Sequence, residues 1–566
     1  MIRKRAGIVL RIGAALGAAM LVPGAAPALV PPGSVASPAL VAFFADWRAL
    51  AAPERTGGVA DFGPAALARK TAALATMRAR FAGLDRSRWT DTDRVDAQLI
   101  EAEMNGLDFD LRVRRPWARD PSYYATVFGE ESDVPAHEGP SADTIDLFAY
   151  RYPLGAADAR ALAERLAGVP ALLARGKQAL AGGNAADLWR YGARAFREQE
   201  ATLAALIAGT LDMRTLDGQQ HATLAGAGPE VMRAAEQARA ATADFARWVA
   251  AEAPKKTGPS GVGKAQYDWY MQHVQRVPYG WDEQVALLKR ELSRAWAGLA
   301  LEEAHNRALP PLVPIDDKAR YDAFAVERMK RYTDFVMAQG FEPDRPFYRA
   351  ALAAQTSHYA APADRNFFSH VTAHDPVPLY SHDIHWVELA RIRHEPNADP
   401  IRRGAPLFNI YAARSEGFAT AFEEIVMQAG MYDDEPRGRE LVWIMLANRA
   451  ARGLASLYVQ ANMIDLEQAG HFHASWTPRG WSDPANPLVG FEQLLYLRQP
   501  GYGTSYITGK LLLDRLIARQ KHAAERAGRA YDVRETFAAI NAVGILPWPL
   551  IEEATTAPEP DPIPTP

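Results

Sequence analysis

The sequence predicts an all-α protein, a large multi-helix body with at most a small hairpin, on two observations. First, long stretches of the chain repeat apolar residues at three- and four-residue spacing, which is the spacing of one face of an α-helix. Second, runs in which apolar and polar residues alternate strictly, as in half-buried strands, are scarce. The best strand candidate is RNFFSHVTA, residues 365–373, where we expect any hairpin to lie.

The expected helices follow this apolar spacing along the chain, and several begin at residues that favour a helix start. Asp158, Asp282 and Asp317 lie near first turns, where an acidic side chain is favourable. Pro229 suits the first helical position, because the N–H that proline lacks has no helical partner there. The predicted helices span residues 64–84, 93–111, 158–180, 229–252, 281–308, 318–339, 414–431, 437–463 and 503–527.

The chain divides best at a stretch rich in Gly, Pro and Lys, for which we predict a flexible linker at residues 251–265. It separates an N-terminal helical half, residues 37–250, from a C-terminal half, residues 266–552, that contains every dense cluster of His and Glu. Residues 553–566 are rich in proline, and we expect a disordered tail. A metal site, if there is one, therefore belongs to the C-terminal half.

The first residues are typical of an export signal. A basic start is followed by an apolar run that ends in small residues, and Ala26-Pro27-Ala28 fits a cleavage site. We predict a signal peptide at residues 1–28. An uncleaved membrane anchor is the alternative, but Arg11 and the short apolar run argue against it. The expectation is an exported protein, periplasmic or secreted, with no stable membrane span after cleavage.

Composition excludes several classes of function. The 566 residues carry 63 basic and 67 acidic side chains, a formal charge of −4, so we expect no nucleic-acid partner. Cysteine is absent, which excludes disulfides, thiolate zinc sites, iron–sulfur clusters and cysteine nucleophiles in this chain. Any metal must be held by His, Asp, Glu or carbonyl groups.

The densest group of metal-binding residue types is YSHDIHWVELARIRHE, residues 380–395. If this segment is helical, successive members of the set His382, His385 and Glu388 lie about 60° apart around the axis, toward one side. Tetrahedral zinc needs three protein ligands, and a carboxylate such as Asp383 is needed to accept the proton of its water. The alternative is a polar helix start in which His385 bonds a backbone carbonyl. This pattern alone leaves both readings open.

A second candidate group lies in RSEGFATAFEEIVMQAG. Glu416 and Glu423 are two helical turns apart, on one face. That face points inward if Phe418 and Phe422 mark the core side, so Glu416 is a natural distant ligand for a site begun at His382. The alternative is a solvated or ion-paired face, which is the usual place of a glutamate.

The third group is YLRQPGYGTSYITGK, in which tyrosines surround a Pro-Gly turn. A tyrosine hydroxyl at such a turn can donate a hydrogen bond to an oxyanion that develops during catalysis. Tyr502 and Tyr506 are the candidates for this role. The alternative is a helix start with packed tyrosine rings.

Several of these pieces together resemble a bacterial family known as domain of unknown function 885. The segments that resemble the family are SEGFATAFEE, NRAARGLASLY, QPGYGTSYITGKLLLDRL and INAVGILPWPLI in the C-terminal half, with RRPWARDP and DWYMQHVQRVPYGWDEQVALLKREL before them. The resemblance runs from about residue 37 to about residue 552. It implies an all-helical fold with a deep central cleft, similar to zinc metallopeptidases of the thimet and carboxypeptidase Taq type, and it implies a zinc hydrolase.

The opening motif departs from that family. Typical members carry His-Glu-x-x-Pro-Gly-His, followed by Glu-Gly-Trp-Ala-x-Tyr-x-Glu. By resemblance, His382 and Glu416 carry over as ligands, and Asp383 replaces the glutamate base. Glu388 occupies the place of the second histidine, whose role is lost or has moved to His385. Glu423 and Glu416 match the two glutamates of the later motif, with Phe418 in place of Trp.

Two functions remain open from the sequence. The first is an exported zinc-dependent hydrolase, most simply a peptidase, with zinc held by His382, Glu416 and either His385 or Glu388. The second is a catalytically inactive relative that uses the same cleft to bind a peptide or another ligand. The loss of the family's Glu base and second His favours the second function, and the retention of Asp, His and Glu at these positions favours the first.

Overall fold

The computed structural model describes residues 30–137 and 139–556. The predicted signal peptide, residues 1–28, lies outside the described residues, as does most of the predicted tail. The last helix runs to Thr555, so the first residues assigned to the tail are helical.

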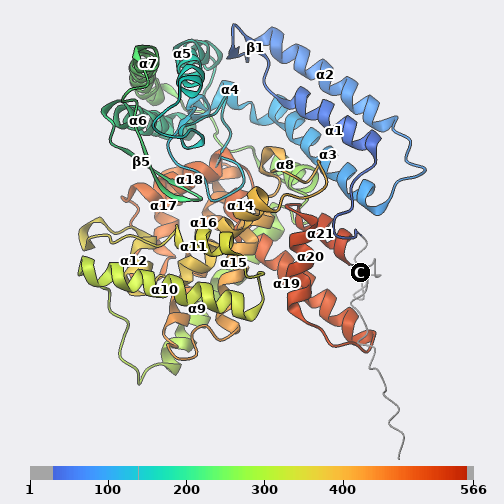
Figure 1. The fold of residues 1–566 in the computed structure, drawn as a ribbon, viewed down its shortest axis with the longest axis vertical. Coiled ribbons are helices and arrows are strands. Elements are labelled where there is room, and N and C mark those ends of the chain that lie inside the picture. Colours follow the sequence, from blue (N-terminus) through green and yellow to red (C-terminus); the bar gives the residue numbers. More distant parts are fainter. Residues whose placement is uncertain (1–29, 138, 557–566) are drawn as a thin grey trace, which may run out of the picture.

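Helices dominate the described chain, which confirms the all-α prediction (Figure 1). The α-helices are α1 (Pro38–Ala51), α2 (Pro64–Ala82), α3 (Asp91–Phe109), α4 (Pro116–Arg119), α5 (Ala156–Ala179), α6 (Ala186–Ala208), α7 (Pro229–Glu252), α8 (Lys264–Tyr270), α9 (Trp281–His305), α10 (Lys318–Gln339), α11 (Pro346–Ala353), α12 (Phe367–His374), α13 (Val377–His382), α14 (Ile384–His394), α15 (Ala412–Gln428), α16 (Gly438–Gln460), α17 (Leu466–Ser475), α18 (Pro487–Arg498), α19 (Tyr502–Arg526), α20 (Val533–Val543) and α21 (Trp548–Thr555). Every helix predicted from apolar spacing is present, with ends shifted by a few residues at most.

Strands in the described part of the chain are short and occur in pairs. The strands are β1 (Arg55–Thr56), β2 (Val59–Ala60), β3 (Val127–Phe128), β4 (Ile145–Asp146), β5 (Leu211–Thr215) and β6 (Gly218–Ala222). β3 and β4 pair in parallel, and the other two pairs are antiparallel. The longest pair, β5 and β6, is a hairpin with a two-residue loop, closed by Gly218 at φ 103°.

The prediction of a strand at residues 365–373 was wrong, because this segment contains α12. The Asn366 side chain accepts a hydrogen bond from the Ser369 backbone N–H, and the Ser369 hydroxyl oxygen accepts one from the Asn366 backbone N–H, so a capping box starts the helix. Phe367 and Val371, one helical turn apart, are both buried. Over so short a run, their apolar spacing also fits the alternation of a strand.

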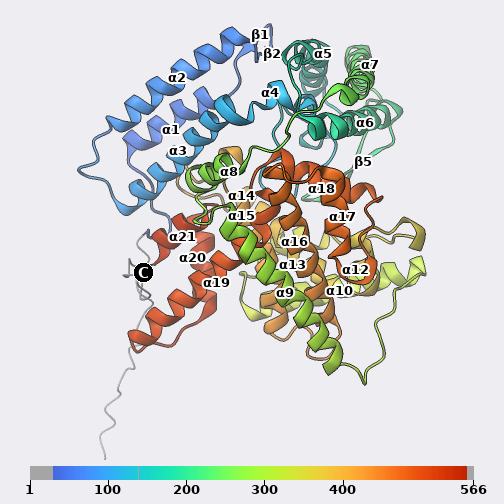
Figure 2. The same cartoon turned by 180° about the vertical axis from the view of Figure 1, so that it is seen from behind.

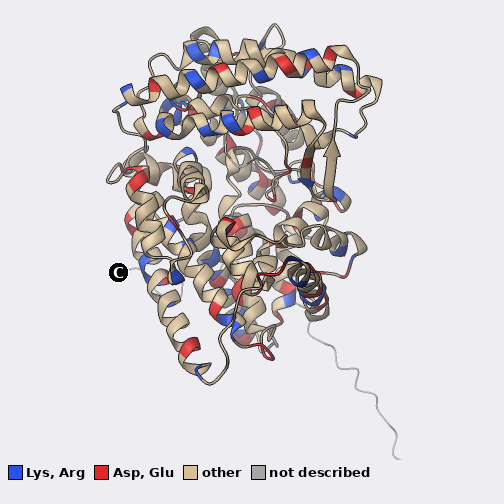
Figure 3. Cartoon of the chain, turned by 90° about the vertical axis from the view of Figure 1, so that its left-hand side faces the viewer, with Lys and Arg blue, Asp and Glu red and all other residues tan. Residues whose placement is uncertain are grey.

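The helices are arranged around two main apolar cores. The larger core joins residues of α1, α2 and α3 with residues of α8 to α11, α13 to α16 and α19 to α21, so it contains segments from both predicted halves of the chain. The smaller core lies among α5, α6 and α7, which form a separate group at one end of the molecule (Figures 1 and 2). The view in Figure 3 shows acidic and basic residues mixed along the helices. Among the described residues, no helix has the length and apolar character needed to cross a bilayer.

The closest helix contact in the larger core lies between α15 and α19. A Cβ added at Gly417 would lie 2.3 Å from the Gly509 Cα, and a Cβ added at Gly509 would lie 1.8 Å from the Ala413 carbonyl oxygen. The two backbones can approach this closely because both positions lack a side chain. This contact fixes the distance between the helices that carry Glu416 and Tyr502.

We predict that Gly509→Ala lowers the free energy of unfolding by about 3 kcal/mol, the upper end of overpacking costs, because the obstructing atom is a backbone oxygen. The matched control is Gly490→Ala in α18, where a Cβ meets no atom within 4 Å. The control should raise stability by about 0.5–1 kcal/mol, through the better helix propensity of alanine. Urea titration measures both changes, and equal effects of the two variants would contradict the close contact.

Candidate metal centre

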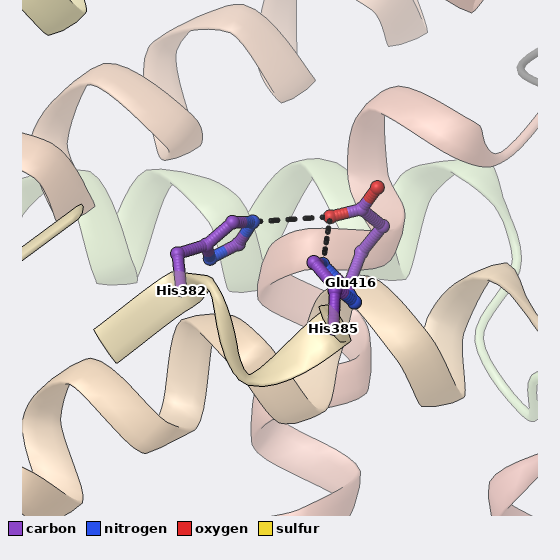
Figure 4. A group of neighbouring side chains, drawn as sticks. All are labelled: His382, His385 and Glu416. Atoms are coloured by element: carbon purple, nitrogen blue, oxygen red, sulfur yellow. Dashed lines mark ion pairs between the residues drawn. The ribbon is translucent and has the colours of Figure 1, made fainter. Parts of the chain in front are cut away.

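The predicted continuous helix through SHDIHWVEL was wrong in one detail, because the helix breaks at Asp383. α13 ends at His382 and α14 begins at Ile384, while Asp383 has φ −65° and ψ 5°. The Asp383 backbone N–H donates to the carbonyls of Leu379 and Tyr380, which closes the last turn of α13. The break changes the direction of the chain between the two histidines, and both side chains still reach α15 (Figure 4).

His382, His385 and Glu416 converge in the interior. The His382 Nε2 atom lies 3.3 Å from Glu416 Oε2, and the His385 Nε2 atom lies 3.4 Å from the same oxygen (Figure 4). One donor atom from each of the three residues lies within 4.8 Å of the other two. The two imidazole rings are nearly perpendicular, at 86°, so they present different edges to the glutamate.

This geometry fits a zinc ion. Ligand atoms 2.0–2.1 Å from a tetrahedral centre lie about 3.3–3.4 Å from one another, which is the separation of the Glu416 oxygen from each histidine nitrogen. His385 Nε2 and Glu416 Oε2 are buried and lack a hydrogen-bond partner among the described residues. The two atoms form an ion pair at 3.4 Å without a hydrogen bond, and because buried polar atoms normally have a hydrogen-bond partner, the space between them suits a cation.

Tyr502 holds the other oxygen of Glu416. Its hydroxyl donates to Glu416 Oε1 at 2.5 Å. Burial by itself would raise the pKa of Glu416, but the His382 and His385 imidazoles hold that pKa well below its ordinary value. Burial likewise opposes a proton on His385, yet the Glu416 carboxylate raises the pKa of His385 to about 9. Glu416 therefore stays ionised and ready to bind a cation.

Glu423 lies two turns after Glu416 on α15 and contacts the side of the His382 ring that faces away from Glu416. Its Oε1 atom is 3.0 Å from His382 Nδ1 and 2.6 Å from Arg449 Nη2, and Arg449 Nη1 donates to Oε2 at 2.9 Å. A carboxylate at Nδ1 keeps the proton on that nitrogen and leaves Nε2 free as a ligand. The order Arg449, Glu423, His382 thus orients the imidazole toward Glu416.

Glu388 lies apart from the three converging residues. Its carboxylate accepts from the Ser415 hydroxyl and pairs with Arg414 Nη2, both at 2.8 Å. It lines a cavity of about 870 Å³ on another side of α14. Of the two alternatives for the third ligand, the structure brings His385 close to His382 and Glu416, and it places Glu388 in an ion pair.

Asp383 is partly exposed at the turn between α13 and α14. Burial raises the pKa of Asp383 to about 7, a rise that the nearby Arg214 opposes and Asp133 adds to. Asp383 is not among the three residues whose donor atoms converge. A carboxyl group that titrates near neutral pH suits proton transfer.

Tyr506 lies beside His382 from α19. The two rings are almost parallel, at 18°, with centroids 6.1 Å apart. The Arg452 guanidinium lies over the Tyr506 ring, with its central carbon 4.3 Å from the ring centroid. A cation at this distance holds the ring by its π-face, so Tyr506 has a fixed place in the site.

Sequence reasoning missed the arginines that complete the site. Arg449 and Arg452 come from NRAARG, a motif read only as a family resemblance, although their i, i+3 spacing in an apolar helix indicates that both face one side. Arg214 and Asp133 come from the N-terminal half, more than a hundred residues before Asp383. No local pattern in the sequence links these two residues to the motif.

We predict that Glu423→Ala lowers the free energy of unfolding by about 3–5 kcal/mol, because Arg449 is left buried and unpaired. The control is Asp322→Ala, which removes an exposed ion pair with Lys318 and should cost about 0.5 kcal/mol or less. The double variant Glu423→Gln with Arg449→Gln should recover part of the loss, since no buried charge stays unpaired. Urea titration of the variants tests this, and a Glu423→Ala cost as small as that of the control would refute the buried pair.

Part of the chain matches a known family. Residues 49–301 match the model of a family described as a bacterial protein of unknown function, DUF885. The match ends before α13, so it supports the resemblance without covering His382 or Glu416. No curated protein matches the sequence.

Two solved structures share the fold. A candidate lipoprotein of unknown function from Shewanella oneidensis is 12% identical and superposes with a TM-score of 0.63, over 91% of this chain and 98% of that one. A candidate lipoprotein from Colwellia psychrerythraea is 14% identical, with a TM-score of 0.59 and the same coverages. At these identities the likeness concerns the fold alone. Residues 49–301 thus match the DUF885 model, and the chain has a fold similar to that of these two bacterial proteins.

Proposed function

We propose that this protein is an exported zinc-dependent hydrolase that acts on peptides. The observation that carries the proposal is the convergence of His382, His385 and Glu416, whose donor atoms lie within 4.8 Å of one another in the interior. Two imidazoles and one carboxylate are a common ligand set of catalytic zinc, in which the fourth position is left for water. The peptide substrate is our inference from the resemblance to domain of unknown function 885, which implies a fold similar to thimet and carboxypeptidase Taq peptidases.

The residues of the chain would hold the metal and move one proton. His382, His385 and Glu416 bind the ion, and Glu423 with Arg449 keeps the His382 imidazole in the ligating orientation. Zinc in such a site supplies a Lewis acid that lowers the pKa of bound water and polarises a carbonyl. Asp383, with a pKa of about 7, is the residue that we propose to accept the proton.

The two tyrosines take different parts in this proposal. The Tyr502 hydroxyl is engaged with Glu416, so Tyr502 holds the ligand in place. Tyr506, whose ring lies beside His382, is the tyrosine that we propose to stabilise negative charge on the substrate.

A second function, the binding of a peptide or another ligand without catalysis, has an observation of its own. The glutamate base of the family that the sequence resembles is replaced by Asp383, whose side chain is one methylene shorter. A general base typically contributes about 10²–10⁴-fold to rate, so its loss or displacement leaves a binding protein.

We expect the purified protein to bind about one zinc ion per chain, through a site with three protein ligands. Removal of the ion by a chelator should lower the melting temperature, since zinc at a hundredfold its Kd stabilises the folded state by about 2.7 kcal/mol. His382→Ala should lose both the zinc and the chelator effect. His370→Ala is the control, because His370 stacks on Trp481 away from the site. Elemental analysis decides, and a metal-free protein indifferent to chelator would defeat the proposal.

Peptide hydrolysis separates the two functions. The zinc-bound protein should cleave members of a peptide library, and Asp383→Asn should lower kcat/KM by about 10²–10⁴-fold with zinc content unchanged. Zinc-bound protein that cleaves no peptide would instead support the binding function.

A further inference from the structure

A cavity of about 670 Å³ lies between segments of the N-terminal half and α18. Its walls come from α6, from the segment before β4, from β5 and from α18. The volume falls in the range of pockets that bind small molecules. Segments far apart in the sequence therefore meet around a space of ligand size.

Two contacts connect this cavity with the metal centre. Arg214, from β5, lines the cavity, and its guanidinium carbon lies 5.2 Å from the centroid of the Trp386 ring, next to His385 in the chain. Leu495, from α18, also lines the cavity and belongs to the same buried apolar cluster as Tyr502 and Tyr506. Through these two contacts, residues that line the cavity are linked to α14 and to α19.

Hydrogen bonds hold the hairpin that carries Arg214 against α14. Arg393, at the end of α14, contacts Glu131 and Asp217, each at 3.0 Å. The Gln355 side chain donates to the Thr215 carbonyl at 3.0 Å, and the Glu131 backbone N–H donates to the Arg214 carbonyl at 2.9 Å. The backbone of Arg214 is therefore anchored on both sides, and its position beside the site is fixed.

Arg214 differs from the other arginines of the cavity in that it makes no ion pair within 4 Å with a described carboxylate, although it lies near enough to Asp383 to lower the pKa of that residue. Arg194 pairs with Glu198, and Arg498 pairs with Asp120. Within residues 30–137 and 139–556, by contrast, no carboxylate lies within 4 Å of the Arg214 guanidinium, and this group lies over the Trp386 ring. A guanidinium stacked on an aromatic face keeps its planar edge of N–H donors available for a carboxylate.

We propose that Arg214 recognises the carboxylate of a short peptide bound in this cavity, and so determines the specificity of the site. The inference rests on the proposed function and names its substrate class: peptides with a free carboxyl terminus near the metal centre. Asp133 lines the same cavity, so a second carboxylate on the ligand would be repelled there.

The test compares an N-acetylated dipeptide with its carboxyl-terminal amide, two probes that differ in one charge. Isothermal titration gives their Kd values for the protein as purified and after chelation. The wild type should bind the carboxylate at least about 10-fold more tightly than the amide, as one charged hydrogen-bonded pair allows. Arg214→Gln should remove this preference, and Arg214→Lys should keep part of it. Asp133→Asn should preserve or increase it.

Arg197→Gln serves as the matched control. Arg197 is exposed on α6 and lines a different cavity, so this variant should keep the wild-type preference. Equal binding of acid and amide by the wild type, a preference that survives Arg214→Gln, or no binding of either probe would overturn the inference. The titration of chelated protein separates this inference from the proposed function. A protein that prefers the carboxylate probe but binds no zinc and hydrolyses no peptide would contradict only the proposed catalysis. A protein that cleaves peptides with zinc but binds the acid and the amide equally well would contradict only the proposed role of Arg214.

Discussion

The buried carboxylate of Glu416 is the constraint on which the rest of the site depends. A charge in the interior is costly unless it is paired and hydrogen-bonded. Glu416 has the His382 and His385 imidazoles on one oxygen and the Tyr502 hydroxyl on the other. These partners come from three helices and meet there because α15 and α19 touch at Gly417 and Gly509. Close packing of the α15 and α19 backbones therefore determines which groups surround the Glu416 carboxylate.

The ion pairs around α15 explain why this carboxylate in particular suits a metal. Glu388 pairs with Arg414, Glu423 with Arg449 and Glu424 with Arg294, so each of these acids has a permanent cation. Glu416 has no arginine or lysine within 4 Å among the described residues, and its neighbours are histidines that ionise only when protonated. A divalent cation would balance Glu416 and let both imidazoles remain neutral, which is the form that binds metal.

The sequence predicted most of the helices and the core of the site, because both depend on local spacing. Apolar periodicity located α7 and α10 to the residue, and helical spacing placed Glu416 and Glu423 on one face. The break at Asp383 was missed, since a turn of one residue leaves the apolar pattern intact. The partners Arg414, Arg449 and Arg214 were missed because tertiary contacts, rather than spacing, bring each of them to its place. The prediction of a strand at residues 365–373 was wrong because the helix there has only about two turns, which is too short for its apolar spacing to be told from that of a strand.

The N-terminal half contributes more to the site than its distance in the sequence indicates. The family match covers residues 49–301, which include Asp133 and Arg214 but none of the three converging residues. If the proposed metal and the proposed ligand of the Arg214 cavity both bind, one part of the chain would hold the metal and another would select the ligand. Such a division lets specificity change by substitutions in β5 while Glu416, buried in the common core, stays fixed. Substitutions at the hairpin should then alter Kd ratios between ligands and leave stability nearly unchanged, whereas those at the contact of α15 with α19 should alter both.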